Sequence, residues 1–205
     1  MTAPDPIPNA PLAVPDAPDV IDELELKARV DDPDGLRAAL ARAGAALTFR
    51  GAMIDHRFDR GRELEDRDEV VRLRVYRPAD GVGWGVLTWK GPVGARGAYR
   101  HRHEIEIRVD APDAVAALLT RLGLAVTLRI DREIEQWVLD GAVLRLEHYP
   151  DMDALLEVEG EPAAIERAVA ASGLPRAVFL PESLPYFIAA FERRTGRPAR
   201  LMGAA

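Results

Sequence analysis

The sequence predicts an α+β fold built around a closed or nearly closed antiparallel β-barrel of about eight strands, flanked by helices. Three observations lead to this prediction. Five segments alternate charged and apolar residues with a period of two, which is typical of a strand with two unlike faces. The charged positions hold almost only Glu, Arg and Lys, whereas a solvated face usually mixes Ser, Thr, Lys and Gln. A stretch of twenty-one residues also recurs, which indicates two similar halves.

The alternation starts in the segment Glu23-Leu24-Glu25-Leu26-Lys27. Its charged side chains share one face of a strand, about 6–7 Å apart, and its leucines share the other. An open sheet with one solvated face would alternate in the same way. Because distant segments all carry charges of mixed sign, we favour a barrel with charged faces inside and apolar faces covered by helices. The further alternating segments are 71–75, 100–109, 144–147 and 157–159.

Prolines and glycines set the limits of the other elements. Proline opens each predicted helix and glycine ends it, so that helices are expected at 33–43, 162–172 and 181–195. A copy of the helix at 33–43 is expected in the second copy of the recurring stretch, at 109–129. Hairpin turns are expected at 78–81 and 140–141. The glycine-rich segment 91–97 is expected to be mobile. The predicted strands are 21–31, 46–50, 54–59, 69–77, 83–90, 100–109, 129–138, 142–148 and 155–159.

The repeated segment covers 30–50 and 109–129. Eleven of the twenty-one positions are identical at a constant offset of 79, without a gap. The same offset places Glu25 on Glu104. Matched Pro, Asp, Gly and Thr residues argue against a coincidence of composition. Two strand–helix–strand units related in this way fit a barrel with an internal pseudo-two-fold repeat.

Composition limits the domains, the partners and the setting. The 205 residues predict one domain at 21–196, after a disordered tail at 1–20 that holds six of the sixteen prolines, and before a frayed end at 197–205. The net charge of −7 argues against a nucleic-acid partner, and no apolar run is long enough to predict a membrane span. There is no cysteine, so a metal would need oxygen or histidine ligands. The start lacks signal-peptide features, so we expect a cytoplasmic monomer or homodimer.

Five motifs occur in an order and at a spacing that resemble those of the CYTH superfamily. This superfamily comprises class IV adenylate cyclases and triphosphatases, and its members are also called triphosphate tunnel metalloenzymes. Each motif is common alone, but the five together are specific. The resemblance covers roughly 20–195 and implies a charged barrel, the triphosphate tunnel, that encloses a polyanion. The motifs are Glu-x-Glu-x-Lys at 23–27, Arg-x-Arg at 72–74, a strand ending in Lys90, Arg-x-Glu-x-Glu at 102–106, and Glu-x-Glu at 157–159 after an acidic residue ten positions earlier.

The resemblance also implies roles for the charged residues. Acidic side chains would bind Mg²⁺ or Mn²⁺, which prefer carboxylate oxygens; they are Glu23, Glu25, Glu104, Glu106, Glu147, Glu157 and Glu159. Basic side chains would bind the phosphates of the substrate; they are Lys27, Arg72, Arg74, Lys90, Arg102 and Arg132. The first four of these are also expected to act in catalysis. Glu147 stands where the family usually has Asp. Strand parity would place Arg129 rather than Arg132 on the charged face, so the choice between them stays open.

Three functions fit these residues. The first is metal-dependent hydrolysis of a triphosphate-bearing small molecule, namely tripolyphosphate, thiamine triphosphate or a nucleoside triphosphate such as ATP. The second is a class IV adenylate cyclase that converts ATP to cyclic AMP and pyrophosphate, and no single residue separates it from the first. The third is a non-catalytic sensor of polyphosphate or nucleotide. The acidic set argues against a sensor, because binding alone would rely more on basic residues.

Two other motifs give weaker signals. His101 and His103 have the spacing of metal ligands, but their parity places them on the mainly apolar face, so the pattern favours a structural role. The glycines at 81, 83 and 85 follow a turn and enter a strand, which does not match a phosphate-binding loop at the start of a helix.

Overall fold

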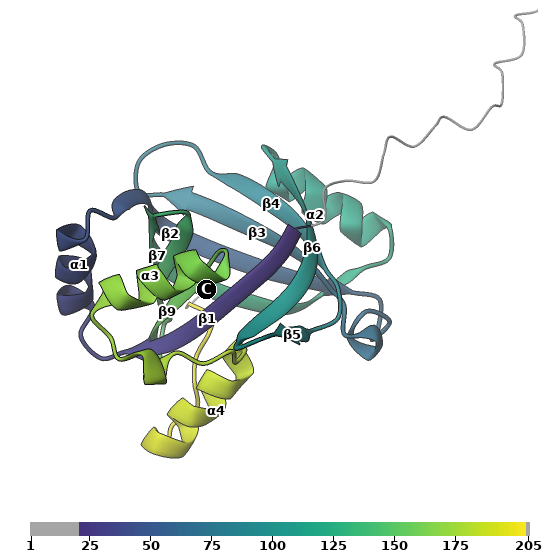
Figure 1. Cartoon of the computed structure of the whole chain (residues 1–205). Helices are drawn as coiled ribbons and strands as arrows, with labels where there is room; N and C mark the ends of the chain where they lie inside the picture. Colours follow the sequence, from purple (N-terminus) through teal and green to yellow (C-terminus); the bar gives the residue numbers. More distant parts are fainter. Residues whose placement is uncertain (1–20, 204–205) are drawn as a thin grey trace, which may run out of the picture.

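The computed structural model describes residues 21–203, in which four α-helices surround one antiparallel sheet (Figure 1). The tail predicted at 1–20 lies outside the described residues. The helices are α1 (Pro33–Arg42), α2 (Pro112–Arg121), α3 (Pro162–Ser172) and α4 (Leu184–Thr195). The strands are β1 (Ile21–Val30), β2 (Ala46–Asp59), β3 (Val70–Pro78), β4 (Trp84–Lys90), β5 (Gly94–Arg96), β6 (Tyr99–Val109), β7 (Ala125–Leu139), β8 (Ala142–His148) and β9 (Ala154–Glu159).

The sheet closes on itself. Its strand order is β1-β9-β8-β7-β2-β3-β4-β6-β5, and β6 also pairs with β1. Eight strands therefore form a closed barrel, and β5 is an additional strand next to β6. The closing pairing is short and runs from Ile21 opposite Glu104 to Glu25 opposite Arg100. The predicted fold class, a closed antiparallel barrel of about eight strands with flanking helices, is confirmed.

The pseudo-two-fold repeat is visible in the topology. The series β1-α1-β2-β3-β4 and β6-α2-β7-β8-β9 have the same order, and each pairing within one half has a counterpart in the other. Between the halves, β1 pairs with β6 and β2 pairs with β7. The segment that recurs in the sequence, which covers the first helix of each half and its flanks, is therefore part of a longer structural repeat.

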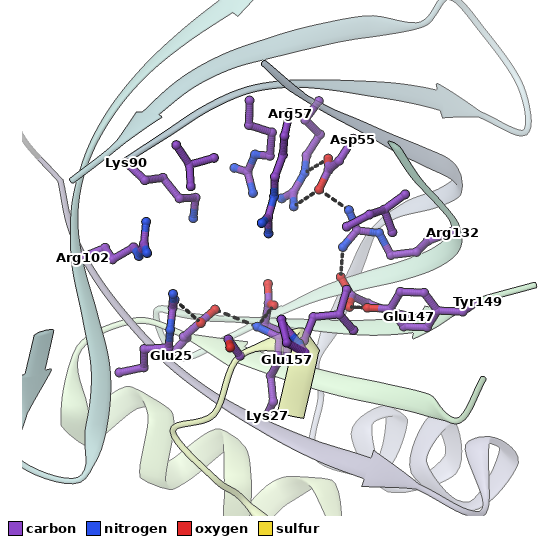
Figure 2. A pocket seen from close by; sticks show the side chains of 18 residues that line it. Glu25, Lys27, Asp55, Arg57, Lys90, Arg102, Arg132, Glu147, Tyr149 and Glu157 are labelled. Carbon is purple, nitrogen blue, oxygen red and sulfur yellow. Dashed lines mark hydrogen bonds and ion pairs between the residues drawn. The ribbon is translucent and has the colours of Figure 1, made fainter. Parts of the chain in front are cut away.

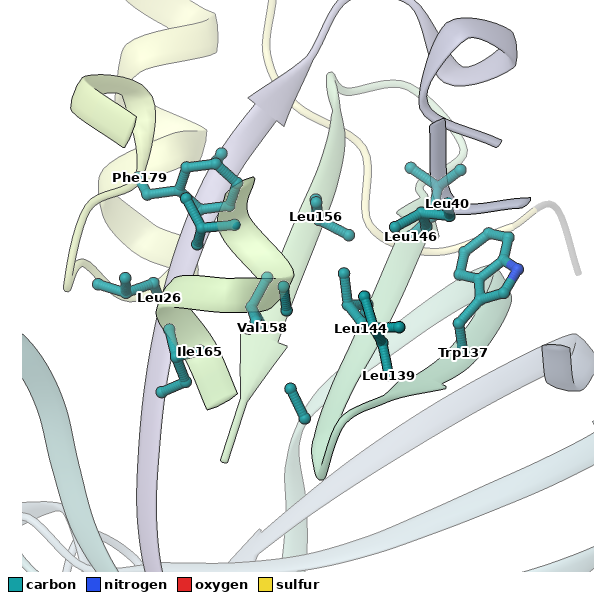
Figure 3. Packing of buried hydrophobic residues seen from close by; sticks show 14 of the residues in the cluster. Leu26, Leu40, Trp137, Leu139, Leu144, Leu146, Leu156, Val158, Ile165 and Phe179 are labelled. Atoms are coloured by element: carbon teal, nitrogen blue, oxygen red, sulfur yellow. The ribbon is translucent and has the colours of Figure 1, made fainter. Parts of the chain in front are cut away.

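The main hydrophobic core lies outside the barrel, between its outer surface and the helices α1 and α3 (Figure 3). Leu26 and Val158 from the strands, Ile165 from α3 and Leu40 from α1 are all fully buried there. Burying a side chain of this size stabilises the fold by about 1.5–3 kcal/mol. The apolar outer faces thus anchor β1, β8 and β9, whose opposite faces point into the barrel.

A second, smaller apolar cluster occupies part of the barrel interior. Phe49, Met53 and Ile134 pack there with Tyr76 and Trp84, whose rings stack with centroids 5.2 Å apart. These residues lie on the same faces of β2, β3, β4 and β7 as the charged residues farther along the strands. The charged groups are therefore confined to the rest of the interior.

Three segments differ from the sequence-based expectation. The strands expected at 46–50 and 54–59 form one strand, β2, which passes so close to the Arg77 carbonyl at Gly51 that a Cβ would clash there. The segment 91–97, expected to be mobile, contains β5, which pairs with β6. Residues 197–203, for which fraying is predicted, form backbone hydrogen bonds to Asp131 and Asp151. No helix within residues 21–203 is long and apolar enough to cross a membrane.

Candidate active site in the barrel

A cavity of about 180 Å³ inside the barrel is lined by charged side chains (Figure 2). Because alternate residues of a strand face inward, every strand of the closed barrel contributes to the lining. Eight cationic side chains surround it, namely Lys27, Arg57, Arg72, Arg74, Lys90, Arg100, Arg102 and Arg132. Four carboxylates do so too, namely Glu25, Asp55, Glu147 and Glu157. The cavity thus has an excess of four positive charges in a chain whose net charge is −7.

Several guanidinium groups in this cavity have N–H groups without a partner among residues 21–203. They are Nε of Arg72, Nε and Nη1 of Arg102, and Nε of Arg132, all buried. Arg57 makes no ion pair with any described carboxylate and points toward the middle of the cavity (Figure 2). Burial and the neighbouring Arg72 lower its pKa. Unpartnered buried donors are costly, and a bound anion would satisfy them.

Lys27 lies on the wall opposite Arg57, between two carboxylates. Its ammonium donates to Glu25 at 2.8 Å and forms an ion pair with Glu157. Burial disfavours the charged amine, but Glu157 and Glu25 raise the pKa of Lys27 above its ordinary value. Burial likewise opposes ionisation of Glu157, yet Lys27 and Arg145 hold the pKa of that carboxyl well below its usual range. Lys27 and Glu157 are therefore a buried pair in which each group favours the charged form of the other.

Three carboxylates, Glu23 and Glu25 of β1 and Glu159 of β9, form a cluster that we call the carboxylate triad. One oxygen from each lies within 4.8 Å of the others. Burial, together with Glu104, raises the pKa of Glu23, and burial with Glu157 raises that of Glu159 well above its ordinary value. Crowded carboxylates of this kind are unfavourable unless a cation or protons lie between them. The all-oxygen donor set fits Mg²⁺ or Mn²⁺.

The other carboxylates predicted as metal ligands lie outside this triad. Glu104 pairs with Lys90, which also donates to Glu23 at 3.0 Å. Glu106 accepts a hydrogen bond from Thr88 at 3.0 Å and is only 3.6 Å from Arg72. Glu104 and Glu106 line a separate pocket together with Glu23 and Glu159 of the triad.

Glu147 is fully buried and has a different set of partners. One oxygen accepts a hydrogen bond from Arg132 at 2.9 Å, and the other accepts one from the hydroxyl of Tyr149 at 2.5 Å. Burial and the Glu147 carboxylate raise the pKa of Tyr149 well above its ordinary value, so the hydroxyl stays protonated and donates. This arrangement orients the guanidinium of Arg132 within the cavity.

Asp55 is a buried cavity residue that the sequence analysis did not place in the site. It accepts hydrogen bonds from Arg74 at 2.8 and 3.0 Å and also pairs with Arg132. Burial opposes its ionisation, but Arg132 and Arg74 hold the pKa of Asp55 well below its usual range. The alternation of 54–58 was a usable signal for Asp55 and Arg57, since both occupy one face of β2.

Arg132, and not Arg129, faces the cavity. Arg132 is buried, whereas Arg129 is 48% exposed and pairs with Asp131 on the outer surface. Strand parity was misleading because the outer face of β7 carries more charge than its inner face. Glu135, on that outer face, is held by Arg37 and Arg50.

Comparison with known proteins agrees with this geometry. The family model described as the CYTH domain matches residues 21–172, most of the chain. The chain belongs to the CYTH family. No curated protein matches it closely enough to add to this assignment.

Solved structures of similar fold accompany the family match. A "putative adenylate cyclase" from Vibrio parahaemolyticus is 20% identical, with a TM-score of 0.68, and the match covers 82% of this CYTH chain and 97% of that chain. The PH1819 protein from Pyrococcus horikoshii is 24% identical, with a TM-score of 0.63 and coverage of 84% and 99%. A Hippeastrum protein, described as a "putative adenylyl cyclase" with "a dominant" triphosphatase activity, is 17% identical, with a TM-score of 0.51 and coverage of 89% and 92%. At these identities the likeness establishes the fold.

Proposed function

We propose that this CYTH protein is a divalent-metal-dependent triphosphatase that hydrolyses a triphosphate-bearing small molecule inside the barrel. The observation that carries the proposal is the placement of a cavity with four excess positive charges directly beside the carboxylate triad. A triphosphate carries about four negative charges, and its enzymes combine cationic side chains with a metal ion that bridges phosphate oxygens. The cavity provides the cationic side chains, and the triad provides carboxylates for the metal ion.

The cationic side chains would bind and orient the phosphate chain. The unpartnered N–H groups of Arg72 and Arg102 are available to donate to phosphate oxygens, and Arg57 is free of any described ion pair. Lys27, Arg74, Lys90 and Arg132 extend this set around the cavity. Because most of these cationic side chains are buried, they would stabilise the charge that develops on the transferred phosphoryl group more strongly than they would in bulk water.

The carboxylate triad would hold Mg²⁺ or Mn²⁺, with Glu157 and Glu104 as neighbouring negative groups. When bound, the metal ion polarises a phosphoryl oxygen and neutralises part of the charge of the substrate. Burial, and in second place neighbouring carboxylates, raise the pKa values of Glu23 and Glu159, and a bound cation would offset both effects. Lys27 and Lys90 link the triad to the cationic cavity through their ion pairs with Glu25 and Glu23.

We favour hydrolysis over cyclisation, and the small volume of the cavity agrees with a site for the phosphate chain. The cavity volume of about 180 Å³ is below the roughly 300–1,000 Å³ of sites that enclose a whole drug-sized ligand. The cavity therefore suits the phosphate chain, and the organic group of thiamine triphosphate or ATP would extend past Ser183, Leu184 and Pro185 at its edge. Formation of cyclic AMP would require the ribose 3′ hydroxyl to attack the α-phosphorus and displace pyrophosphate, so the ribose itself would have to enter the cavity. The triphosphatase activity attributed to the Hippeastrum relative supports the same choice.

A product assay tests the proposal. The purified chain is incubated with Mg²⁺ or Mn²⁺ and with tripolyphosphate, thiamine triphosphate or ATP, and phosphate, pyrophosphate and cyclic AMP are resolved separately. We expect phosphate release that a chelator abolishes. Cyclic AMP and pyrophosphate in equal amounts would instead identify a cyclase. Tight binding of every substrate without any product would identify a sensor, and either result would overturn the proposal.

A further inference from the structure

A second group of metal-ligating side chains lies on the outer surface of the barrel, away from the cavity. It consists of Asp22 at the start of β1 and of His101 and His103 on β6, and one ligand atom from each lies within 4.8 Å of the others. The Oδ1 atom of Asp22 is 3.1 Å from Nε2 of His101 and 2.9 Å from Nδ1 of His103. The two imidazole rings lie edge to face, with centroids 4.9 Å apart.

The pairing of β1 with β6 brings these three residues together. Asp22 is directly opposite His103, and His101 is opposite the next outward residue of β1, Leu24. Directly opposite residues such as Asp22 and His103 have Cβ atoms about 4.5–5.5 Å apart, and diagonal neighbours such as Asp22 and His101 are about 7–8 Å apart, within reach of long side chains. An aspartate and two histidines at these positions can therefore bind one metal ion together. Because alternate residues face opposite sides, Glu23 points into the barrel while Asp22 points out. The cluster is therefore separate from the carboxylate triad.

The composition of this cluster differs from that of the triad in a way that matters for the choice of metal. Imidazole nitrogens favour zinc, copper, nickel and iron, whereas all-carboxylate sites favour magnesium and manganese. The Asp22 oxygen already lies about 3 Å from each histidine nitrogen, and all three donors lie within 4.8 Å of one another, a spread that a zinc ion with bonds of about 2.0–2.1 Å can draw together. Open zinc sites commonly use three protein ligands with water in a fourth position. His103 is 58% exposed and Asp22 46% exposed, so an ion can reach the cluster from solvent.

A neighbouring residue also supports the orientation of the aspartate. Nη1 of Arg96, on β5, is 3.5 Å from Oδ2 of Asp22. The arginine therefore contacts one carboxylate oxygen while the other faces both histidines. Charged groups that hold the second oxygen of a ligating carboxylate are common around metal sites and fix its direction.

We propose that Asp22, His101 and His103 form a second metal site, specific for a transition-metal ion of the zinc type, which clamps the pairing that closes the barrel. The β1–β6 pairing runs only from Ile21 to Glu25 on β1, and a shared ion bonded to both strands adds a crosslink across it. The same short part of β1 carries Glu23 and Glu25 on its inner face. Zinc at this site stabilises the folded barrel by mass action and leaves the chemistry of the cavity to the magnesium-type site.

Zinc binding to the full chain, purified without a polyhistidine tag, tests the proposal. The four histidines of the chain provide a matched pair of variants, His101→Gln with His103→Gln, and His56→Gln with His148→Gln. We expect the wild type and the second pair to bind one zinc ion in equilibrium dialysis and to melt at a higher temperature with zinc than without. The variant with both His101→Gln and His103→Gln should bind zinc at least about 10-fold more weakly than the wild type. Magnesium should not replace zinc in this effect.

Further variants keep the test decisive. His103→Gln alone changes the most exposed ligand, so it should fold, as circular dichroism will show, and should also weaken zinc binding. Glu25→Gln should retain the zinc ion. Equal zinc binding by the two histidine pairs, no zinc binding by the wild type, or loss of the ion in Glu25→Gln would each overturn the proposal. None of these outcomes depends on triphosphatase activity, so the two proposals can fail separately.

Discussion

Replacing Glu25 with Gln tests the carboxylate triad, because it removes one negative charge and keeps the shape of the side chain. Glu25 is buried and accepts hydrogen bonds from Lys27 and Arg100, both at 2.8 Å. Two unit charges about 4 Å apart interact by about 4 kcal/mol at an effective dielectric constant of about 20. The variant loses an attraction of this order between the Glu25 carboxylate and the metal ion. Part of the lost attraction is offset, because Lys27 and Arg100 become freer to bind phosphate. We expect kcat/KM to fall about 10²-fold, which corresponds to about 2.7 kcal/mol of transition-state stabilisation.

The assay measures initial rates with the best substrate over a series of Mg²⁺ and Mn²⁺ concentrations. In Glu25→Gln the metal concentration that gives half of the maximal rate should rise and kcat should fall, because the variant binds the metal less tightly. Glu133→Gln is the matched control: it makes the same chemical change on the exposed outer face of β7 and should behave like the wild type. If Glu25→Gln turns over within about threefold of the wild type, with unchanged metal dependence, the assigned site is wrong.

Three further predictions concern the cavity. Lys27→Met removes the buried cation between Glu25 and Glu157, so kcat/KM should fall about 10²-fold with a higher KM in steady-state kinetics; an unchanged KM would contradict a phosphate contact. Tripolyphosphate should raise the melting temperature in scanning fluorimetry, and more so with Mg²⁺, whereas no shift at millimolar ligand would exclude a triphosphate site. The pKa of Asp55 is lowered by Arg132 and Arg74 against the cost of burial, so its contribution to stability is present above the ordinary value of 3.8 and is lost as the pH falls through the lowered pKa. Thermal melts below about pH 4 should therefore be less acid-sensitive in Asp55→Asn than in the wild type; equal sensitivity would refute this.

The sequence was sufficient to predict the barrel because its signals were local and repeated. A period of two appears wherever one strand face is charged and the other contacts a helix, as in β1, where Leu26 is fully buried and Glu25 faces inward. β7 shows the limit of this rule. Its outer face is charged because Glu135 pairs with Arg37 of α1 and Arg50 of β2, and these contacts depend on tertiary structure.

The grouping of the carboxylates could not be predicted from spacing alone. Glu147 precedes Glu157 by ten residues, which suggests one metal site. In the β8–β9 hairpin, however, Glu159 is opposite Val143, and Glu147 lies four residues farther along β8, about 13 Å away. Strand register, which is set by the length of the connection and by the packing of the outer faces, therefore separates Glu147 from the carboxylate triad.

The difference between the two halves of the repeat would allow one barrel to bind both of the proposed ligands, a metal ion and a polyanion. The repeat offset of 79 residues places Glu23 on Arg102 and Lys27 on Glu106, so the paired strands β1 and β6 carry different charges at matching positions. The strands β3 and β4 contribute mainly cations to the interior, whereas their counterparts β8 and β9 contribute Glu147, Glu157 and Glu159 and one cation, Arg145. A symmetric barrel would present the same charges on both walls. Because the proposed metal–triphosphate complex would require carboxylates on one side and cations on the other, we infer that the shared positions of the repeat build the barrel and that the divergent positions would provide its chemistry.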